Sequence, residues 1–267
     1  MANDADTLMV NGIPMEMPES MTAHVDSMLK QWYSKHYLTF SEEDCQTTKN
    51  HSTELSDSVV AERLARIPTL MEMPYNEVVR KYIDQYIVKS KGLVSYMLGA
   101  MNFYMPIFEE ALDLYNLPNE LKYLPIIESA LNPQATSRAG AVGLWQFMLK
   151  TGKLYGLQSN SLVDERRDPI KATFAAARYL KDLYNIYGDW SLVIAAYNCG
   201  PGNVNKAIHR ADGSHDYWEI YPYLPRETRG YVPNFIAANY IMNYYCQHDI
   251  CPMQVQLPAA TDTMIVS

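Results

Sequence analysis

Apolar residues recur at three- and four-residue intervals through most of this 267-residue chain, and this spacing restricts it to a mainly α fold. The clearest case is the segment 75–90, which is predicted to be an amphipathic helix. Its apolar face consists of Val78, Val79, Tyr82, Ile83, Tyr86 and Ile87. Strand signals are scarce, and no repeat with a period of about 20 to 50 residues appears. The sequence therefore predicts a helical protein that is not a solenoid.

Capping residues fix the bounds of several helices. Asp168 followed by Pro169 predicts a helix start, and Gly188 predicts the end of that helix. Asp189 is expected to cap the next helix, which runs to about Asn198. Further helices are predicted over residues 21–36, 54–66, 93–114, after residue 202, and over 234–247.

Two prolines bear on helix ends. Pro106 is expected to divide the segment 93–114 into two shorter helices, because proline lacks the backbone N–H of a helix interior. Pro125 is expected either to open a helix in its first turn or to kink one. In both cases Glu128 falls at the end of a helix.

Charge and composition exclude some function classes. The net charge of −8 and the isoelectric point near 5.3 argue against a nucleic-acid partner, which would require clustered Lys and Arg. No run approaches the roughly 18 apolar residues of a membrane span, and the first residues lack the basic and apolar regions of a secretion signal. Met1 is therefore interpreted either as the start after a removed signal or as the start of a cytoplasmic protein.

The four cysteines carry little information. Cys246 and Cys251 are five residues apart, and a disulfide between them and a pair of free thiols are equally acceptable. Cys199 is interpreted as a small buried residue rather than a nucleophile, because no His lies near it in sequence. No CxxC pattern occurs, so a structural zinc site is not predicted.

Glu128 is the candidate acid catalyst. It lies between the apolar segments 124–127 and 130–131, and partial burial there would raise its pKa by disfavouring the charged form. A carboxyl with a raised pKa can act as a general acid. The alternative is a capped or salt-bridged structural glutamate.

Two later segments carry glycine turns with aromatic and amide side chains. In the segment 137–146 the chain can turn at Gly140 and Gly143, and Gln146 is expected to hold a ligand hydroxyl. Trp145 could stack on a sugar, although a core position is slightly favoured. After the third segment the chain reverses at 200–202, and the Tyr197 hydroxyl could position Glu128 or a reacting hydroxyl. As a bare turn this last segment would be ordinary.

Taken together, these segments resemble the soluble lytic murein transglycosylase (SLT) catalytic domain. Within that family, the segment 117–125 and the long helical lead-in are most similar to the membrane-bound transglycosylase D branch. The motifs that carry the resemblance are Glu128-Ser129 with Asn132-Pro133 and Ser137, Gly140-Ala141, Gly143-Leu144-Trp145-Gln146, Ala196-Tyr197-Asn198, Gly200-Pro201-Gly202, and Glu227-Thr228-Arg229 before Tyr231-Val232. They occur in order over about residues 117–245. Cys199 and Trp145 depart from the family, which commonly has alanine and methionine there.

The resemblance implies a goose-type-lysozyme-like helical fold. It also implies cleavage of the β-1,4 bond between N-acetylmuramic acid and N-acetylglucosamine in peptidoglycan, with closure of a 1,6-anhydro ring and no water consumed. Glu128 would be both acid and base. The implied substrate-binding residues are Ser137, Gln146, Tyr197, Asn198 and Tyr231. Further candidates are Ser129, expected to cap or pack behind Glu128, Trp145, and Glu227, for which pairing with Arg226 or Arg229 is an equal alternative.

Residue composition and the resemblance together predict four parts of the chain. The expected parts are a flexible terminus at 1–18, a helical lead-in packed on the catalytic lobe at 19–116, the SLT-like domain at 117–248, and a tail or start of a linker at 249–267. No cofactor or metal is expected. The expected partner is the peptidoglycan glycan strand, with the chain a monomer in the periplasm or at the outer membrane, where anchoring through a removed N-terminal signal is an option.

Two other functions compete. A true lysozyme would share the fold and the acid but would use water to capture the sugar. A peptidoglycan-binding module that has lost catalysis would not need an acid in an apolar setting, so Glu128, Gln146 and Tyr197 together argue against it.

Overall fold

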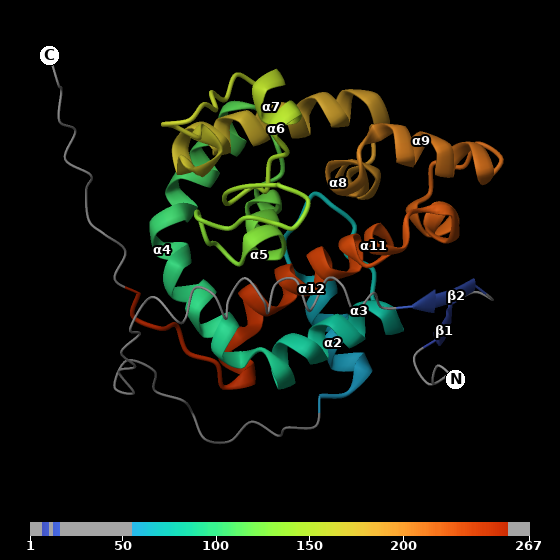
Figure 1. Cartoon of the computed structure of the whole chain (residues 1–267). Helices are drawn as coiled ribbons and strands as arrows, with labels where there is room; N and C mark the ends of the chain where they lie inside the picture. Colours follow the sequence, from blue (N-terminus) through green and yellow to red (C-terminus); the bar gives the residue numbers. More distant parts are fainter. Residues whose placement is uncertain (1–6, 11–12, 17–54, 256–267) are drawn as a thin grey trace, which may run out of the picture.

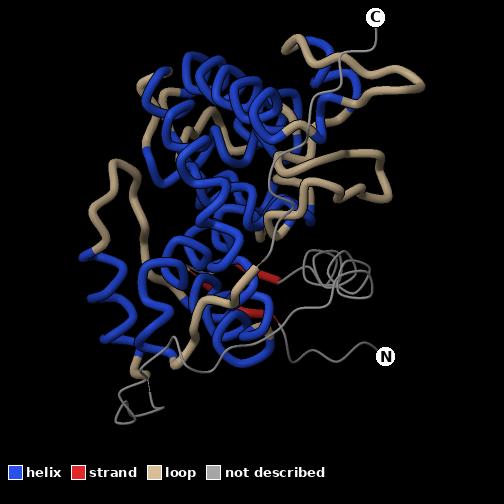
Figure 2. The backbone as a smooth tube through the Cα atoms, turned by 90° about the vertical axis from the view of Figure 1, so that its left-hand side faces the viewer, coloured by secondary structure: helices blue, strands red, loops and turns tan. Residues whose placement is uncertain are grey.

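The computed structural model describes residues 7–10, 13–16 and 55–255, and helices dominate them, which confirms the mainly α prediction (Figures 1 and 2). Its helical elements, with short 3-10 and π turns written η, are α2 (Asp57–Arg66), α3 (Glu77–Asp84), η3 (Gln85–Lys89), α4 (Lys91–Leu114), η4 (Asn119–Tyr123), α5 (Leu124–Ser129), α6 (Leu149–Leu154), η5 (Glu165–Arg167), α7 (Pro169–Tyr187), α8 (Trp190–Cys199), α9 (Pro201–Arg210), α10 (Tyr217–Ile220), η6 (Tyr221–Tyr223), α11 (Arg226–Arg229), α12 (Tyr231–Tyr244) and η7 (Tyr245–His248).

Two short strands form a hairpin near the N-terminus. Strand β1 (Thr7–Val10) pairs antiparallel with β2 (Ile13–Glu16), with Val10 opposite Ile13. The hairpin lies within the terminus 1–18, for which the sequence predicted flexibility. Strand β1 lies against α3 and β2 against η6. The helix predicted over 21–36 lies outside the described residues.

Helix α12 is the central element of the fold. It packs against α3, α5, α8 and α11, and Figure 1 shows it crossing the middle of the molecule. Twelve of its residues are buried, in accordance with a helix that is apolar on all sides. The elements that carry the candidate site residues therefore meet on one buried scaffold.

The helices before residue 105 pack closely on α12. Val79 and Ile83 of α3 are fully buried, and the Tyr86 hydroxyl donates to Asn234 Oδ1 at 2.9 Å. The buried carboxylate of Glu120 accepts hydrogen bonds from the backbone N–H groups of Leu70 and Met71. These contacts join the lead-in to the remainder of the described chain.

Helix α4 differs from the prediction that Pro106 would divide it. The helix runs without a break from Lys91 to Leu114, with Pro106 in its interior. Pro106, Asn102 and Phe103 lie on the exposed side, so the carbonyl that loses its N–H partner can be solvated. Buried Phe108 and other residues hold the opposite side against the core.

The capping predictions are confirmed. The Asp168 side chain accepts from the N–H groups of Ile170 and Lys171 at the start of α7, and Gly188 ends that helix at φ 65°. Asp189 caps α8 by accepting from the N–H of Leu192. Pro125 lies in the first turn of α5, so it opens that helix rather than kinking one.

Cys251 is disulfide-bonded, whereas Cys246 and Cys199 are free thiols, so the disulfide considered between Cys246 and Cys251 does not form. Within the part of the chain that the structure describes, no helix has both the length and the apolar character needed to cross a membrane.

Candidate active site

Glu128 occupies the last turn of α5, as the sequence predicted. The six-residue helix ends because Ala130 and Leu131 adopt left-handed backbone conformations, with φ 51° and 61°. The N–H groups of these two residues then bond back to the carbonyls of Ile126 and Pro125. This sharp ending leaves the Glu128 side chain half-buried, while its neighbours on both sides are buried.

The Glu128 carboxyl has one hydrogen-bond partner among the described side chains. The hydroxyl of Tyr231, the first residue of α12, donates to Glu128 Oε1. Burial raises the pKa of Glu128 from 4.5 to about 7, and the bond from Tyr231 acts in the opposite direction. A carboxyl with this pKa is available as an acid near neutral pH.

Tyr231 therefore contacts the carboxyl itself. The sequence placed it among the substrate-binding residues, which stays a prediction; its side chain is 1% exposed and its hydroxyl donates to Glu128. Burial, together with the charge of Glu128 and the bond to it, raises the pKa of Tyr231 well above the ordinary tyrosine value, so the phenol stays protonated and remains a donor.

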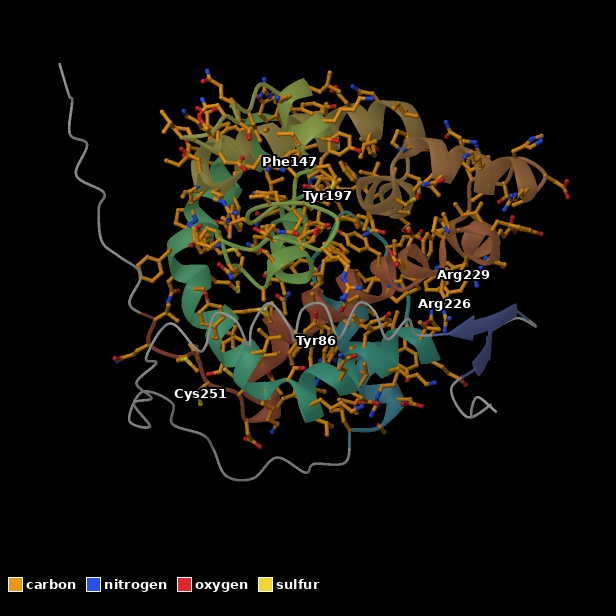
Figure 3. All side chains as sticks on the ribbon, in the orientation of Figure 1. Tyr86, Phe147, Tyr197, Arg226, Arg229 and Cys251 are labelled. Atoms are coloured by element: carbon orange, nitrogen blue, oxygen red, sulfur yellow. The ribbon has the colours of Figure 1, made fainter. Side chains whose placement is uncertain are left out.

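Tyr197, in α8, lies close to Glu128 without bonding to it. Its hydroxyl donates to the carbonyl oxygen of Trp145 at 2.8 Å. Burial first, and then the charge of Glu128, raise the pKa of Tyr197 well above its ordinary value. On its other side the ring packs on Tyr179, whose centroid is 5.3 Å away. Figure 3 shows Tyr197 in the same part of the molecule as Phe147.

The segment 134–147 forms a compact loop beside Glu128. Val142 pairs antiparallel with both Thr136 and Phe147, and the predicted turns occur at Gly140 and Gly143, with φ 85° and 84°. At Gly143 the fit is tight, because a Cβ there would lie 1.8 Å from the carbonyl oxygen of Arg166.

Ser137 and Gln146 lie at opposite ends of this loop, and both are half-buried. The Ser137 Oγ accepts from the N–H of Ala141 at 3.0 Å, which leaves its hydroxyl hydrogen available. Gln146 has a left-handed backbone, with φ 47°, and its Nε2 donates to the carbonyl of Gly143 at 2.9 Å and towards that of Ala135 at 3.4 Å.

Two of the further candidates lie behind the site. Ser129 is 1% exposed, and its Oγ lies 3.1 Å from the Pro125 carbonyl and 2.9 Å from that of Leu144, so it connects α5 to the loop. The Trp145 ring is also 1% exposed, packs edge-on against Phe108, and donates from Nε1 to Thr173 Oγ1 at 2.9 Å. Only the main chain of Trp145 faces the site.

Asn198 and Glu227 are exposed. Glu227 forms no ion pair within the described residues, and Arg229 instead donates to the backbone carbonyls of Leu224 and Pro222. Over the same part of the chain, no group of three or more His, Cys, Asp or Glu is arranged to hold a metal ion.

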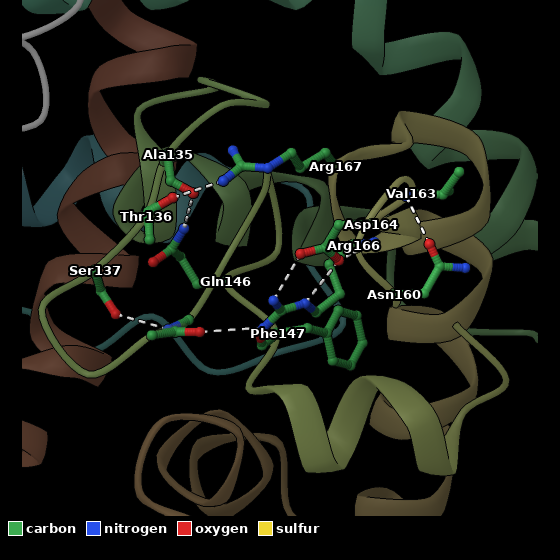
Figure 4. A network of polar contacts seen from close by, with 12 residues as sticks. Ala135, Thr136, Ser137, Gln146, Phe147, Asn160, Val163, Asp164, Arg166 and Arg167 are labelled. Atoms are coloured by element: carbon green, nitrogen blue, oxygen red, sulfur yellow. Dashed lines mark hydrogen bonds and ion pairs between the residues drawn. The ribbon is translucent and has the colours of Figure 1, made fainter. Parts of the chain in front are cut away.

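Arg166 was not predicted from the sequence as part of the site. Its guanidinium is buried under the loop and bonds to Asp164 and to two loop carbonyls (Figure 4). The sequence signal for a buried ion pair was Asp164, two residues before Arg166. These residues belong to a run of five charged residues, 164–168, and such a run usually lies on a solvated surface.

Comparisons with known proteins show which family the chain is similar to. Residues 105–220 match the family model described as Transglycosylase SLT domain. Membrane-bound lytic murein transglycosylase D of Escherichia coli (strain K12) is 40% identical over 176 residues, which are 64% of this chain and 38% of that protein. Soluble lytic murein transglycosylase of the same strain is 33% identical over 124 residues, which are 44% of this chain and 19% of that protein. The chain thus spans less than two fifths of these relatives.

A solved structure shares the fold. The 70-kDa soluble lytic transglycosylase in complex with bulgecin A is similar with a TM-score of 0.50 at 23% identity, over 72% of this chain and 31% of that one. This likeness confirms the predicted lysozyme-like helical fold. Residues 105–220 of this chain therefore match the transglycosylase SLT domain and, over a wider stretch, the chain is similar to membrane-bound lytic murein transglycosylase D.

Proposed function

We propose that this protein is a lytic transglycosylase that cleaves the β-1,4 bond between N-acetylmuramic acid and N-acetylglucosamine in peptidoglycan. The observation that carries the proposal is the half-buried Glu128 carboxyl, whose pKa of about 7 leaves a large protonated fraction at neutral pH. The SLT match and the relatives named lytic murein transglycosylases support the same chemistry.

The bond from Tyr231 decides which oxygen of Glu128 carries the acidic proton. Because Tyr231 donates to Oε1, that oxygen is an acceptor, and the proton of the neutral acid is on Oε2. Oε2 is thus the atom that would face the scissile bond.

In the first step Glu128 Oε2 gives its proton to the glycosidic oxygen, and the bond from that oxygen to C1 of the muramic unit breaks. In the second step the carboxylate takes the proton from the C6 hydroxyl of the same sugar, while the C6 oxygen bonds to C1. The 1,6-anhydro ring closes, Glu128 regains its proton, and no water is consumed. Tyr231 stabilises the carboxylate between the two steps by its charge-assisted bond.

A single carboxylate suffices for this sequence of steps. Retaining glycosidases place a second carboxylate about 5–5.5 Å from the first, and such a charge would further raise the pKa of the acid. Burial and Tyr231 account for the shift of Glu128 among the described residues, and the exposed Glu227 takes no part in it. This favours the transglycosylase over a paired-carboxylate hydrolase, and a lysozyme that shares the single acid is the second candidate.

The substrate is proposed to lie across Glu128 between the loop 134–147 and the end of α8. The Ser137 hydroxyl hydrogen, the Gln146 amide, the exposed Asn198 and the Tyr197 ring edge are the groups available to hold it. The lead-in helices are proposed to form one folding unit with the SLT domain. Peptidoglycan as partner locates the protein outside the cytoplasm, in the periplasm or at the outer membrane.

Mass spectrometry of the muropeptides released from purified peptidoglycan tests the proposal. We expect products one water lighter than the reducing sugar, absent with Glu128→Gln and retained with Glu227→Gln, the matched exposed carboxylate. Fully hydrated products would identify a lysozyme, and the absence of soluble products from the unaltered protein would indicate a binding module.

A further inference from the structure

The side chain of Arg166, in η5, holds the loop 134–147 through hydrogen bonds to its backbone. The guanidinium forms a two-pronged ion pair with Asp164, at 2.9 Å from Nε to Oδ1 and 2.7 Å from the terminal nitrogen to Oδ2. Its other terminal nitrogen donates to the carbonyls of Gly140 at 3.1 Å and Phe147 at 3.0 Å (Figure 4). One buried side chain thus ties the two arms of the loop together.

The main chain of Arg166 contacts the same loop. Its carbonyl oxygen lies 1.8 Å from the position that a Cβ on Gly143 would take, so only a glycine hydrogen fits there. Arg166 therefore fixes the loop at three points: Gly140, Gly143 and Phe147. Its ion pair with Asp164, which lowers the pKa of that carboxyl, holds the guanidinium in place.

The neighbouring Arg167 holds the first residues of the loop. Its guanidinium donates to the carbonyl of Gln134 at 2.7 Å and to Thr136 Oγ1 at 2.9 Å. Ala135 lies between these two contacts. The adjacent arginines of η5 thus flank the two carbonyls, of Ala135 and Gly143, that meet the Gln146 side chain.

These two carbonyls dictate how the Gln146 amide is turned. A carbonyl oxygen only accepts hydrogen bonds, so the side-chain nitrogen must face Ala135 and Gly143. The amide oxygen, Oε1, then points the other way, and no described residue donates to it. Gln146 is therefore presented as a hydrogen-bond acceptor.

We propose that Arg166 is a positioning residue that, with Arg167, holds the loop so that Gln146 presents Oε1 to a hydrogen-bond donor on the substrate. On a glycan strand that donor is a sugar hydroxyl or the N–H of an acetamido group. The inference rests on the proposed function, because it assigns a binding role within the same site.

A double-mutant cycle between Arg166 and Gln146 tests this role. Lysine retains the charge of Arg166 but offers one nitrogen, which does not span Asp164, Gly140 and Phe147 together. With soluble glycan fragments, we expect Arg166→Lys to raise KM about tenfold and to change kcat by less than about threefold, as the loss of one hydrogen bond in the bound state implies. In the Gln146→Ala background, Arg166→Lys should leave KM unchanged.

Arg178→Lys is the matched control. Arg178 also donates to a backbone carbonyl, that of Tyr155, but this contact lies outside the loop. We expect KM to be unaltered in this variant, with a melting temperature close to that of the unaltered protein.

Arg167→Ala keeps the test decisive if Arg166→Lys fails to fold. Arg167 is half-buried and contacts only the edge of the loop, so this variant should fold and should raise KM in the same direction, again only when Gln146 is present. Equal effects with and without Gln146, or an unchanged KM in both arginine variants, would overturn the proposal. A lack of anhydro products from the unaltered protein would instead refute the proposed function itself.

Discussion

Tyr231 and Glu128 are 103 positions apart in the chain, and the hydroxyl of the first donates directly to the carboxyl of the second. The bond joins the start of α12 to the end of α5. The bond lowers the pKa of Glu128 against the larger, opposite effect of burial, and Tyr231 lies outside the segment 105–220 that matches the SLT family model.

Tyr231→Phe should shift the pH profile of the reaction. A hydrogen bond to a charged group contributes about 1.5–3 kcal/mol, so its loss should raise the pKa of Glu128 by about one to two units. The alkaline limb of kcat/KM, expected near pH 7 in the unaltered protein, should move to higher pH, and the plateau should fall about tenfold. Tyr86→Phe, which removes a bond from a buried tyrosine to Asn234 in the same helix α12, should leave the limb in place. Equal profiles for Tyr231→Phe and the unaltered protein would contradict this assignment.

Glu128→Gln should stabilise the fold at neutral and alkaline pH. The folded-state pKa of about 7 is above the unfolded value of 4.5, so the folded state binds the proton more tightly and loses stability as pH rises through this window. The variant avoids that loss, which amounts to at most about 3 kcal/mol. Urea denaturation at pH 8 should show the gain, and at pH 4 the two proteins should be equally stable. A constant difference across this range would show that burial does not set the acidity of Glu128.

Tyr197→Phe should reduce activity beyond what its loss of stability explains. The substitution leaves the carbonyl of Trp145 without its phenol donor, at a stability cost of about 1 kcal/mol, and frees the main chain next to Gln146. Tyr187→Phe is the matched control, because the Tyr187 hydroxyl also bonds a backbone carbonyl, that of Pro201, at 3.0 Å. If both variants lose the same activity at equal stability, Tyr197 has no specific part in the site.

Gly143→Ala and Gly140→Ala should differ sharply, although both glycines have nearly the same φ. Alanine at Gly140 meets open space and should cost about 1–2 kcal/mol for the left-handed backbone alone. Alanine at Gly143 would collide with the carbonyl of Arg166 and should cost more than about 4 kcal/mol. Denaturation midpoints of the two variants measure the difference. Similar midpoints would mean that Gly143 does not pack against the Arg166 carbonyl of η5.

A fragment of residues 105–255 should not fold, whereas residues 55–255 should. The shorter fragment removes α3, whose Val79 and Ile83 are fully buried, and leaves apolar surface of α12 in water. Far-ultraviolet circular dichroism and a cooperative melting transition distinguish the two. A cooperative transition in the shorter fragment would show that the lead-in is a separate unit.

Local features were predictable from the sequence because their physics is local. Asp168 and Gly188 delimit α7 through contacts within four residues, and the position of Glu128 at a helix end follows from Pro125 and the apolar run around it. The uninterrupted helix through Pro106 was not predictable, because it depends on which side of α4 faces water.

Pairings across the fold could not be derived in this way. The sequence predicted that the Tyr197 hydroxyl could position Glu128 or a reacting hydroxyl and listed Tyr231 among the substrate-binding residues, but it could not show that Tyr231 donates to Glu128 and Tyr197 to the carbonyl of Trp145. Burial of Arg166 likewise depends on a loop whose contacting residues are 19 and 26 positions away, and a charged run in isolation favours a surface position.

Because α12 packs on α3, the lead-in helices influence the environment of the Glu128 carboxyl. Tyr231 is the first residue of α12, and α12 packs on α3, whose Val79 and Ile83 are fully buried. A small shift of α12 along α3 would therefore lengthen the hydrogen bond from Tyr231 to Glu128. The pKa of Glu128 would then depend on packing residues that are remote from the site. Related enzymes could diverge in their preferred pH through changes in such aliphatic contacts, with every residue of the site retained.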